Sequence, residues 1–262
     1  MKTGPDIVYT QSDGVGVVTL NRPQARNALT FGMYEEIARI CADPAACGDP
    51  RVLILTGAGD KAFAAGTDIG QFRSFSTAQD SIDYEARIER VLDTIETCPV
   101  PTIAAISGAV TGGGAAIAAC CDIRIATASA RFGFPIARTL GNCLSIANYA
   151  RLVNLLGPAR VKEMIFTARL LDADEAKAVG LFAEIVADHP TLVARMRSLA
   201  ETIAGNAPLT LRATKEALRR IGRAATDGLD GQDIVLSCYL SEDFREGMDA
   251  FLNKRKPQWK GR

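Results

Sequence analysis

The order of apolar and polar positions divides the chain into two parts. Up to about residue 190, short apolar runs rich in branched residues alternate with stretches that repeat apolar residues at helical spacing. Beyond that point only the helical pattern continues, which predicts an α/β core followed by an all-helical end. The expected strands lie at 15–20, 52–56, 102–106, 123–126 and 182–186. The expected helices lie at 30–41, 79–97, 115–120, 145–155, 158–167, 191–204, 209–221, 233–240 and 242–252.

Two local signals refine this division. Asp172 and Glu175 have the spacing of a capping box, which predicts a helix that begins there and is closed by Gly180. The run Ala-Gly-Asn-Ala-Pro at 204–208 interrupts the helical pattern and reads as a hinge. We therefore expect a core domain at 1–205 and a separate helical region at 206–262.

Two short glycine-containing runs are the most informative motifs. Phe-Ala-Ala-Gly-Thr-Asp-Ile at 63–69 and Thr-Gly-Gly-Gly-Ala-Ala at 111–116 each follow a strand-like stretch. A glycine turn at a helix N-terminus leaves backbone N–H groups free to bind a negative oxygen. Taken alone, each run is better explained as a tight strand-to-helix turn in which glycine avoids a steric clash. Together, in this order and setting, they favour a two-donor oxyanion hole.

Composition excludes several classes of function. The 262 residues include 30 basic and 30 acidic side chains, and this zero net charge argues against a nucleic-acid or anionic-membrane partner. No apolar run approaches the roughly 20 residues needed to span a bilayer, and the first residues lack a signal-peptide core. The seven cysteines show no metal-like spacing. We expect a cytoplasmic protein with reduced thiols, no membrane contact and no metal site.

The motifs resemble those of the crotonase, or enoyl-CoA hydratase/isomerase, superfamily. The matching blocks occur in order over most of the chain, at 20–29, 53–57, 61–69, 99–114, 121–126, 132–133, 155–160 and 176–181. The resemblance implies a crotonase-like spiral of ββα units, followed by a C-terminal α-helical region that mediates oligomerisation. It also implies a homotrimer, or a hexamer built as a dimer of trimers, and apolar positions at helical spacing after residue 230 agree with such an interface.

The resemblance further implies an acyl-CoA thioester as substrate and no separate cofactor. The backbone N–H groups of Thr67 and Gly113 would stabilise the thioester enolate. Arg26 could simply be solvated, and Asp68 is better explained as a carboxylate that holds the turn than as a catalyst. The residues that correspond to the coenzyme A contacts of the family are Arg26, Ala28, Ala65, Gly66, Asp68 and Ile69.

This chain departs from the family's hydratases at the two positions that carry glutamates. Ala116 and Ile136 stand there, and neither can move a proton. Arg138 could hold a substrate carboxylate or point to solvent, whereas Asn142 and Ser145 have the residue types of helix caps. The residues expected to line the acyl pocket are Ala116, Phe134, Ile136, Arg138, Asn142 and Ser145.

Other catalytic groups are outside candidates. Asp83, Tyr84 and Glu85 lie on the polar helix after the first glycine turn and could lean over the pocket. A nucleophile such as Cys143 would need a base, but His189 lies in a polar Asp-His-Pro segment.

Three functions remain open for this sequence. The first is an acyl-CoA enzyme with non-hydratase chemistry, such as decarboxylation of a malonyl-type thioester, because loss of CO2 yields the enolate without a base. The second is an acyl-CoA-binding protein with little or no catalysis. The third is weak hydration by a water held at Ser145, Asn142 or Thr67.

Overall fold

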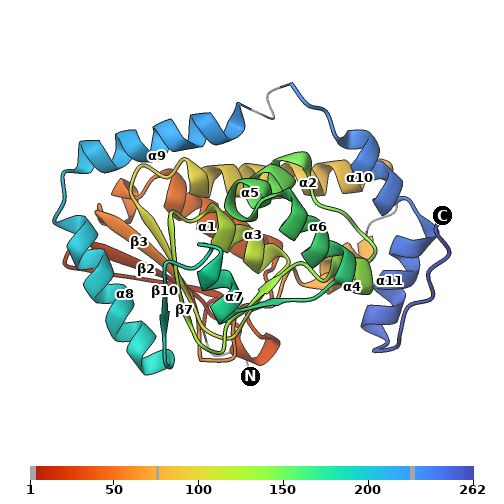
Figure 1. Cartoon of the computed structure of the whole chain (residues 1–262), viewed down its shortest axis with the longest axis horizontal. Helices are drawn as coiled ribbons and strands as arrows, with labels where there is room; N and C mark the ends of the chain where they lie inside the picture. The colour runs from red at the N-terminus through yellow and green to blue at the C-terminus, as the bar shows by residue number, and fades with distance from the viewer. Residues whose placement is uncertain (1–3, 75–76, 225–227) are drawn as a thin grey trace.

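The computed structural model (Figure 1) describes residues 4–74, 77–224 and 228–262. Its strands form two sheets. The first sheet has the order β1-β2-β3-β5-β7-β10 and is parallel except for the β1–β2 pair. Its strands are β1 Ile7–Ser12, β2 Val15–Leu20, β3 Val52–Gly57, β5 Thr102–Ile106, β7 Ile123–Thr127 and β10 Glu184–Val186. The second sheet has the order β4-β6-β8-β9, with strands β4 Ala62–Ala64, β6 Ala109–Thr111, β8 Arg131–Gly133 and β9 Leu171–Asp172.

Three consecutive segments repeat the same order of elements. Each contributes one strand to the first sheet, then a short strand to the second sheet, and then a helix: β3-β4-α2, β5-β6-α3 and β7-β8-α4. Their helices are α2 Ala78–Glu96, α3 Gly113–Cys120 and α4 Ile136–Thr139. The expected ββα arrangement is therefore present as a structural repeat, although the sequence shows no repeat.

Both faces of the first sheet are buried. Along β3, Val52 and Ile54 pack with helix α8 (His189–Ala204), whereas Leu53 and Leu55 pack with helix α1 (Phe31–Ala42) in the larger core. Figure 1 shows α8 covering one side of the sheet. Burial on both faces favours continuous apolar runs over alternating ones, which explains why the parallel strands β2, β3, β5, β7 and β10 were readable from the sequence.

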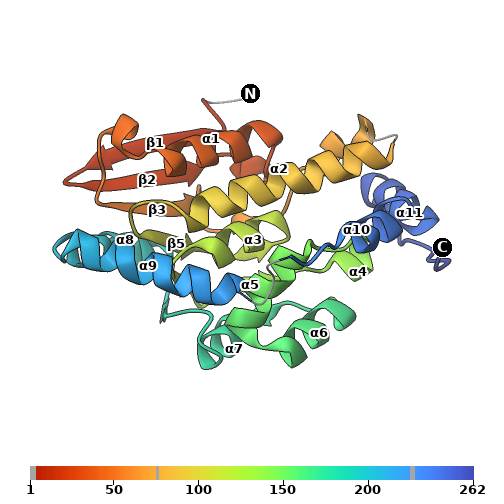
Figure 2. The ribbon, with the colours of Figure 1, turned by 90° about the horizontal axis from the view of Figure 1, so that it is seen from above.

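The C-terminal helices lie along the outside of this core and end at one side of it. Helix α9 (Pro208–Arg223) has no buried residue and exposes Leu209, Leu218 and Ile221. Helices α10 (Gln232–Tyr239) and α11 (Glu242–Leu252) lie beside one end of α2 in Figure 2, where α10 buries Val235 and Tyr239. Part of the apolar surface expected to form an oligomer interface is thus covered by the chain itself.

Most elements expected from the sequence are confirmed, with ends that differ by no more than two residues. Asp172 and Glu175 form the expected capping box at the start of α7 (Ala173–Ala178). Strand β1, the four short strands of the second sheet and the short helix α4 were not expected. The remaining helices are α5 Ile146–Leu156, α6 Pro158–Thr167 and the short η1 Pro23–Ala25, η2 Ala45–Cys47 and η3 Ile69–Ser74. In the described part of the chain, no helix combines the length and apolarity needed to cross a membrane.

Candidate active site

The two glycine turns lie against each other. Strands β4 and β6 are parallel neighbours, so the turns that follow them leave the sheet at the same edge. Gly66 and Gly112 both have positive φ, at 102° and 52°, which glycine adopts without strain. A Cβ atom on Gly112 would lie 3.4 Å from the Cα of Gly66. This close approach brings Thr67 and Gly113, the next residues of the two turns, to one place.

The N–H groups expected to bind an oxyanion have no hydrogen-bond acceptor among the described residues. Gly113 is the first residue of α3, where the helix itself offers no acceptor for the N–H group. Thr67 is paired with Leu29 in an isolated parallel bridge. The hydrogen bonds of this bridge join Leu29 to Gly66 O and Asp68 N, so they do not use the N–H group of Thr67. Both donors are thus held by surrounding backbone and remain available to a ligand.

The segment at 26–29 is fastened to the first turn. Leu29 N donates to Gly66 O at 2.8 Å, and Ala65 N donates to Arg26 O at 3.0 Å. The structure therefore brings Arg26, Ala28, Ala65 and Gly66, which were expected to contact coenzyme A, to one edge of the site.

Arg26 and Asp68 differ in what they contact. The Arg26 side chain is exposed, and its backbone ends the short helix η1 in the left-handed conformation. Asp68 accepts from Gly70 N at 3.1 Å and from Arg22 Nη1 at 3.0 Å, and Arg22 also donates to Ala28 O at 2.7 Å. The carboxylate of Asp68 thus ties the 22–28 segment to the turn, in keeping with the turn-holding role considered for it.

A cavity of about 140 Å³ lies beside the two turns. Its walls include Ala116, Phe134, Ile136 and Asn142, as expected for the acyl pocket. The described lining residues also include residues of the two turns and their neighbours: Ala65, Gly66, Thr67, Ile69, Thr111, Gly112, Gly113 and Cys143. The cavity therefore joins the proposed oxyanion donors to an apolar wall.

Arg138 and Ser145 are not among the described residues that line this cavity. Arg138 is exposed on α4, where it lies about 200° around the helix from the buried Ile136. Ser145 is the N-cap of α5: its Oγ accepts from Asn148 N at 3.2 Å and donates to Glu89 at 3.3 Å. The helix-capping alternative thus describes Ser145, whereas Asn142 caps no helix and faces the cavity.

Three hydroxyl groups meet at the first turn. Thr67 Oγ1 shares hydrogen bonds with Tyr34 Oη at 2.8 Å and with Tyr84 Oη at 3.3 Å. Tyr34 is fully buried on α1, and burial raises the pKa of its phenol far above the ordinary range. The threonine at this position therefore has a structural partner on each side, while its backbone N–H group is left free.

A second hydrogen-bonded group crosses the other end of the cavity. Tyr239 Oη donates to Glu85 Oε1 at 2.6 Å, and Asn142 Nδ2 donates to Tyr239 Oη at 3.3 Å. Burial raises the pKa of the Glu85 carboxyl to about 7, against the opposing effect of the Tyr239 hydrogen bond. Of the three outside candidates, Tyr84 and Glu85 line the cavity, whereas Asp83 is exposed and accepts from Gln79.

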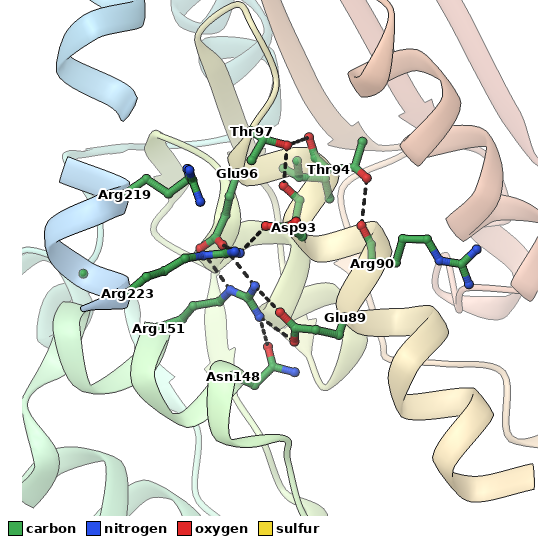
Figure 3. Close-up of polar contacts among 12 residues, drawn as sticks. Glu89, Arg90, Asp93, Thr94, Glu96, Thr97, Asn148, Arg151, Arg219 and Arg223 are labelled. Atoms are coloured by element: carbon green, nitrogen blue, oxygen red, sulfur yellow. Dashed lines mark hydrogen bonds and ion pairs between the residues drawn. The ribbon is translucent and has the colours of Figure 1, made fainter. Parts of the chain in front are cut away.

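An ion-pair cluster anchors the C-terminal half of α2 (Figure 3), beginning at Glu89, one turn after Glu85. Arg151 on α5 donates to both carboxylate oxygens of Glu89, at 2.5 and 2.9 Å, and to Glu96 at 3.0 Å. Arg223 at the end of α9 pairs with Glu96 and Asp93. Since the Arg151 side chain is buried, the cluster fixes α2 against α5 and α9 and thereby holds Glu85 in the cavity wall.

The other reactive groups do not form a nucleophilic site. Burial raises the pKa of the Cys143 thiol well above its ordinary value, so it remains a thiol. His189 begins helix α8 instead of a polar loop, and its Nδ1 lies 2.9 Å from Ser107 Oγ. Neither Ser107 nor His189 is among the described residues that line the cavity.

The chain is similar over most of its length to proteins of one known family. Residues 10–262 match the model of the enoyl-CoA hydratase/isomerase family. The short-chain-enoyl-CoA hydratase of Clostridium acetobutylicum is 34% identical over 253 residues, and the crotonyl-CoA hydratase of Syntrophomonas wolfei is 36% identical over 258 residues. Each alignment covers 96% of both proteins.

Two solved structures extend the similarity to the fold. A methylmalonyl-CoA decarboxylase in complex with 2-nitronate-propionyl-CoA superposes with a TM-score of 0.88 at 29% identity, covering 99% of this chain and 100% of the other. An enoyl-CoA hydratase/carnithine racemase from Magnetospirillum magneticum superposes with a TM-score of 0.78 at 34% identity, covering 99% and 97%. The crotonase-like fold is confirmed, and the chain belongs to the enoyl-CoA hydratase/isomerase family.

Proposed function

We propose that this protein is an acyl-CoA enzyme that stabilises a thioester enolate between the N–H groups of Thr67 and Gly113. The observation that carries the proposal is the close approach of the two glycine turns, which leaves both donors without an acceptor in the described residues. Donors fixed in this way stabilise developing negative charge without reorganisation, and each is worth about 3–4 kcal/mol in related sites. The substrate itself is the thioester, so the reaction needs no separate cofactor.

The proposed enzyme is not an efficient hydratase. Ala116 and Ile136 present methyl and aliphatic groups to the cavity at the positions where hydratases of this family carry carboxylates. Hydration needs groups that hold a water and move protons, and each such group contributes roughly 10²–10⁴-fold. The wall formed by Ala116 and Ile136 supplies neither function.

Decarboxylation of a malonyl-type thioester is a second candidate. It is favoured by the whole-chain similarity to a methylmalonyl-CoA decarboxylase. Loss of CO2 delivers the enolate directly, so the two N–H donors suffice for the first step. Asn142, which lines the cavity, is better placed than the exposed Arg138 to orient the departing carboxylate.

We further propose that the active form is a homotrimer or a dimer of trimers. Helix α9 supports this proposal because Leu209, Leu218 and Ile221 are 63–79% exposed on a helix that buries no residue. Apolar side chains gathered on one helix in this way are typical of an interface between protein surfaces.

A single screen tests the proposed activity. The purified protein is incubated with crotonyl-, malonyl-, methylmalonyl- and 3-enoyl-CoA, the products are followed by mass spectrometry, and binding is measured by calorimetry. We expect binding of the thioesters and conversion of at least one substrate other than crotonyl-CoA. Binding without any conversion would instead identify a non-catalytic acyl-CoA-binding protein, and failure to bind would contradict both functions.

A further inference from the structure

Glu85 places one carboxyl group in a cavity that otherwise lacks charge. Among the described residues that line it, no other is an aspartate or glutamate, and none is a lysine, arginine or histidine. The group comes from α2, whereas the family positions occupied here by Ala116 and Ile136 lie on α3 and α4. The cavity thus contains a proton-carrying group on a different wall from the one where the family's hydratases carry theirs.

The neighbouring hydrogen bonds determine which oxygen of Glu85 carries the proton. Asn142 donates to the phenolic oxygen of Tyr239, and Tyr239 donates its own proton to Glu85 Oε1. Oε1 is therefore an acceptor, and a proton on the carboxyl group belongs on Oε2. In the described part of the chain Oε2 has no hydrogen-bond partner. Tyr239 and Asn142 therefore leave one oxygen of Glu85 free for a ligand.

The surroundings of Glu85 keep both protonation states accessible near neutral pH. Burial and the charge of Glu89 raise the pKa of Glu85 to about 7, and the hydrogen bond from Tyr239 lowers it. The other titratable groups that interact with Glu85 are Tyr34 on α1, Tyr84 on α2, Cys143 before α5, Tyr149 on α5 and Tyr239 on α10. Burial raises the pKa of each of them, so each is neutral. Arg151 pairs with Glu89 and limits the effect of that charge. A proton-transfer group works best when its pKa lies near the working pH.

We propose that Glu85 is the proton-transfer group of this site and acts at the α-carbon of the bound thioester. The inference rests on the proposed function, because it needs an enolate held at Thr67 and Gly113. In one direction the Oε2–H bond breaks, the electron pair of the enolate forms the new C–H bond, and Glu85 becomes a carboxylate that solvent reprotonates. In the other direction the carboxylate removes an α-proton from a saturated acyl-CoA and yields the enolate.

The same step serves two substrate classes. After decarboxylation of a malonyl-type thioester, protonated Glu85 completes the reaction by delivering the proton to the enolate. With a saturated acyl-CoA, ionised Glu85 exchanges the α-protons with solvent. Tyr239 is a positioning residue in both cases, since it acts on the substrate only through Glu85.

Proton exchange in D2O provides the test. Butyryl-CoA is incubated with the full-length protein, deuterium at the α-carbon is followed by mass spectrometry, and butyryl-CoA binding is measured separately by calorimetry. We expect exchange with the wild type and a loss of about 10²-fold or more in Glu85→Gln, with unchanged binding. Asp83→Asn is the matched control, because Asp83 is exposed on the same helix and contacts Gln79. It should exchange at the wild-type rate.

The outcomes separate this inference from the proposed function. Binding without exchange, or equal exchange by wild type and Glu85→Gln, would overturn the role of Glu85 and leave thioester binding intact. Failure of the wild type to bind butyryl-CoA would overturn the proposed function and this inference with it. Circular dichroism of each variant verifies that it is folded.

The pH profile of Tyr239→Phe tests whether Tyr239 positions Glu85 or only supports the fold. Removing the hydrogen bond donated to the carboxylate should raise the pKa of Glu85. The pH at which exchange reaches half of its maximum should therefore move upward, while butyryl-CoA binding is retained. A pH profile identical to that of the wild type would contradict the proposed positioning by Tyr239.

Discussion

The hydroxyl group of Tyr34 occupies the space that a side chain on Gly113 would need. A Cβ atom at residue 113 would overlap Tyr34 Oη and lie 3.0 Å from Thr67 Oγ1. Tyr34 is fully buried on α1 and shares a hydrogen bond with Thr67, so it cannot move aside freely. Glycine at 113 is therefore required by packing as well as by the proposed chemistry of its N–H group.

Gly113→Ala should destabilise the protein by about 1–3 kcal/mol, as expected for overpacking. In a Tyr34→Phe background the nearest atoms to the new methyl group would be Thr67 Oγ1 and the ring of residue 34, at 3.0 and 3.2 Å. The cost of Gly113→Ala should then fall. Urea unfolding of the four proteins of this double-mutant cycle measures the coupling. Gly32→Ala, whose new methyl group would have no atom closer than 3.9 Å, is the control. Additive effects at 34 and 113 would show that the hydroxyl does not restrict residue 113.

The same pair of positions isolates the contribution of the Gly113 N–H group to catalysis. Gly113→Ala and Gly113→Pro, both in the Tyr34→Phe background, each add a Cβ atom, but only proline removes the donor. Proline is also tolerated at the first position of a helix, which Gly113 occupies in α3. We expect the proline variant to turn over its thioester substrate about 10²–10³-fold more slowly than the alanine variant. Equal rates would exclude this N–H group from the oxyanion hole.

Local sequence signals were sufficient for the parts of the site built from consecutive residues. The glycine turns and the residues that follow them, Thr67 and Gly113, were identified because the turn chemistry lies within a few positions. The parallel strands of the first sheet were readable because burial on both faces favours continuous apolar runs. The edge strand β1 was missed because half of its residues are polar and exposed. The strands of the second sheet have three residues or fewer, too few to establish a period.

Contacts between distant residues could not be read in the same way. Tyr239 lies 154 positions from Glu85, and nothing local to either residue indicates their hydrogen bond. Tyr34 belongs to the buried stripe of α1, where its pattern is that of an ordinary core residue. Arg138 was assigned to the pocket because its segment follows the second glutamate position and lines the acyl pocket in the family, with exposure to solvent as the alternative. The structure places it on the exposed side of α4, as in that alternative. Two residues that are two positions apart on a helix lie on opposite sides of it, and this rule would have placed Arg138 away from the pocket once Ile136 was taken to face it.

Crotonyl-CoA should be hydrated several orders of magnitude more slowly than by a two-glutamate hydratase, because two groups each worth roughly 10²–10⁴-fold are absent. Ultraviolet assay of the enoyl thioester measures this rate directly. The double variant Ala116→Glu with Ile136→Glu should raise it if the cavity admits the longer side chains. Ala116→Gln with Ile136→Gln, which adds similar volume without a base, is the control. A wild-type turnover number in the ordinary hydratase range would refute this interpretation of Ala116 and Ile136.

Glu85 should make the stability of the folded protein depend on pH. Its pKa is raised from 4.5 to about 7 in the folded state, so the folded protein holds this proton over a range in which the unfolded chain has lost it. The stabilisation of the folded state by protonated Glu85 is complete below about pH 4.5 and is lost as the pH rises through about 7. The free energy of unfolding of the wild type, relative to Glu85→Gln, should therefore fall by about 3 kcal/mol between pH 4.5 and pH 8. Urea titrations at matched protein concentration measure this difference, and a constant difference would show that Glu85 titrates normally.

Light scattering should show a trimer or hexamer at micromolar concentration, and the structure indicates which helix to perturb. Leu218→Glu with Ile221→Glu places two charges on the exposed apolar side chains of α9, which contribute nothing to the buried core of the chain. We expect this variant to dissociate into folded monomers, because burying a carboxylate in an interface costs several kcal/mol. Ala213→Glu, which adds a charge to the same helix without replacing an exposed apolar side chain, should keep the wild-type mass.

A stop after Ala207 removes α9, α10 and α11 together and should give insoluble or monomeric protein, because α10 also supplies the cavity wall through Tyr239. A full-length wild-type chain that elutes as a monomer would contradict the proposed assembly.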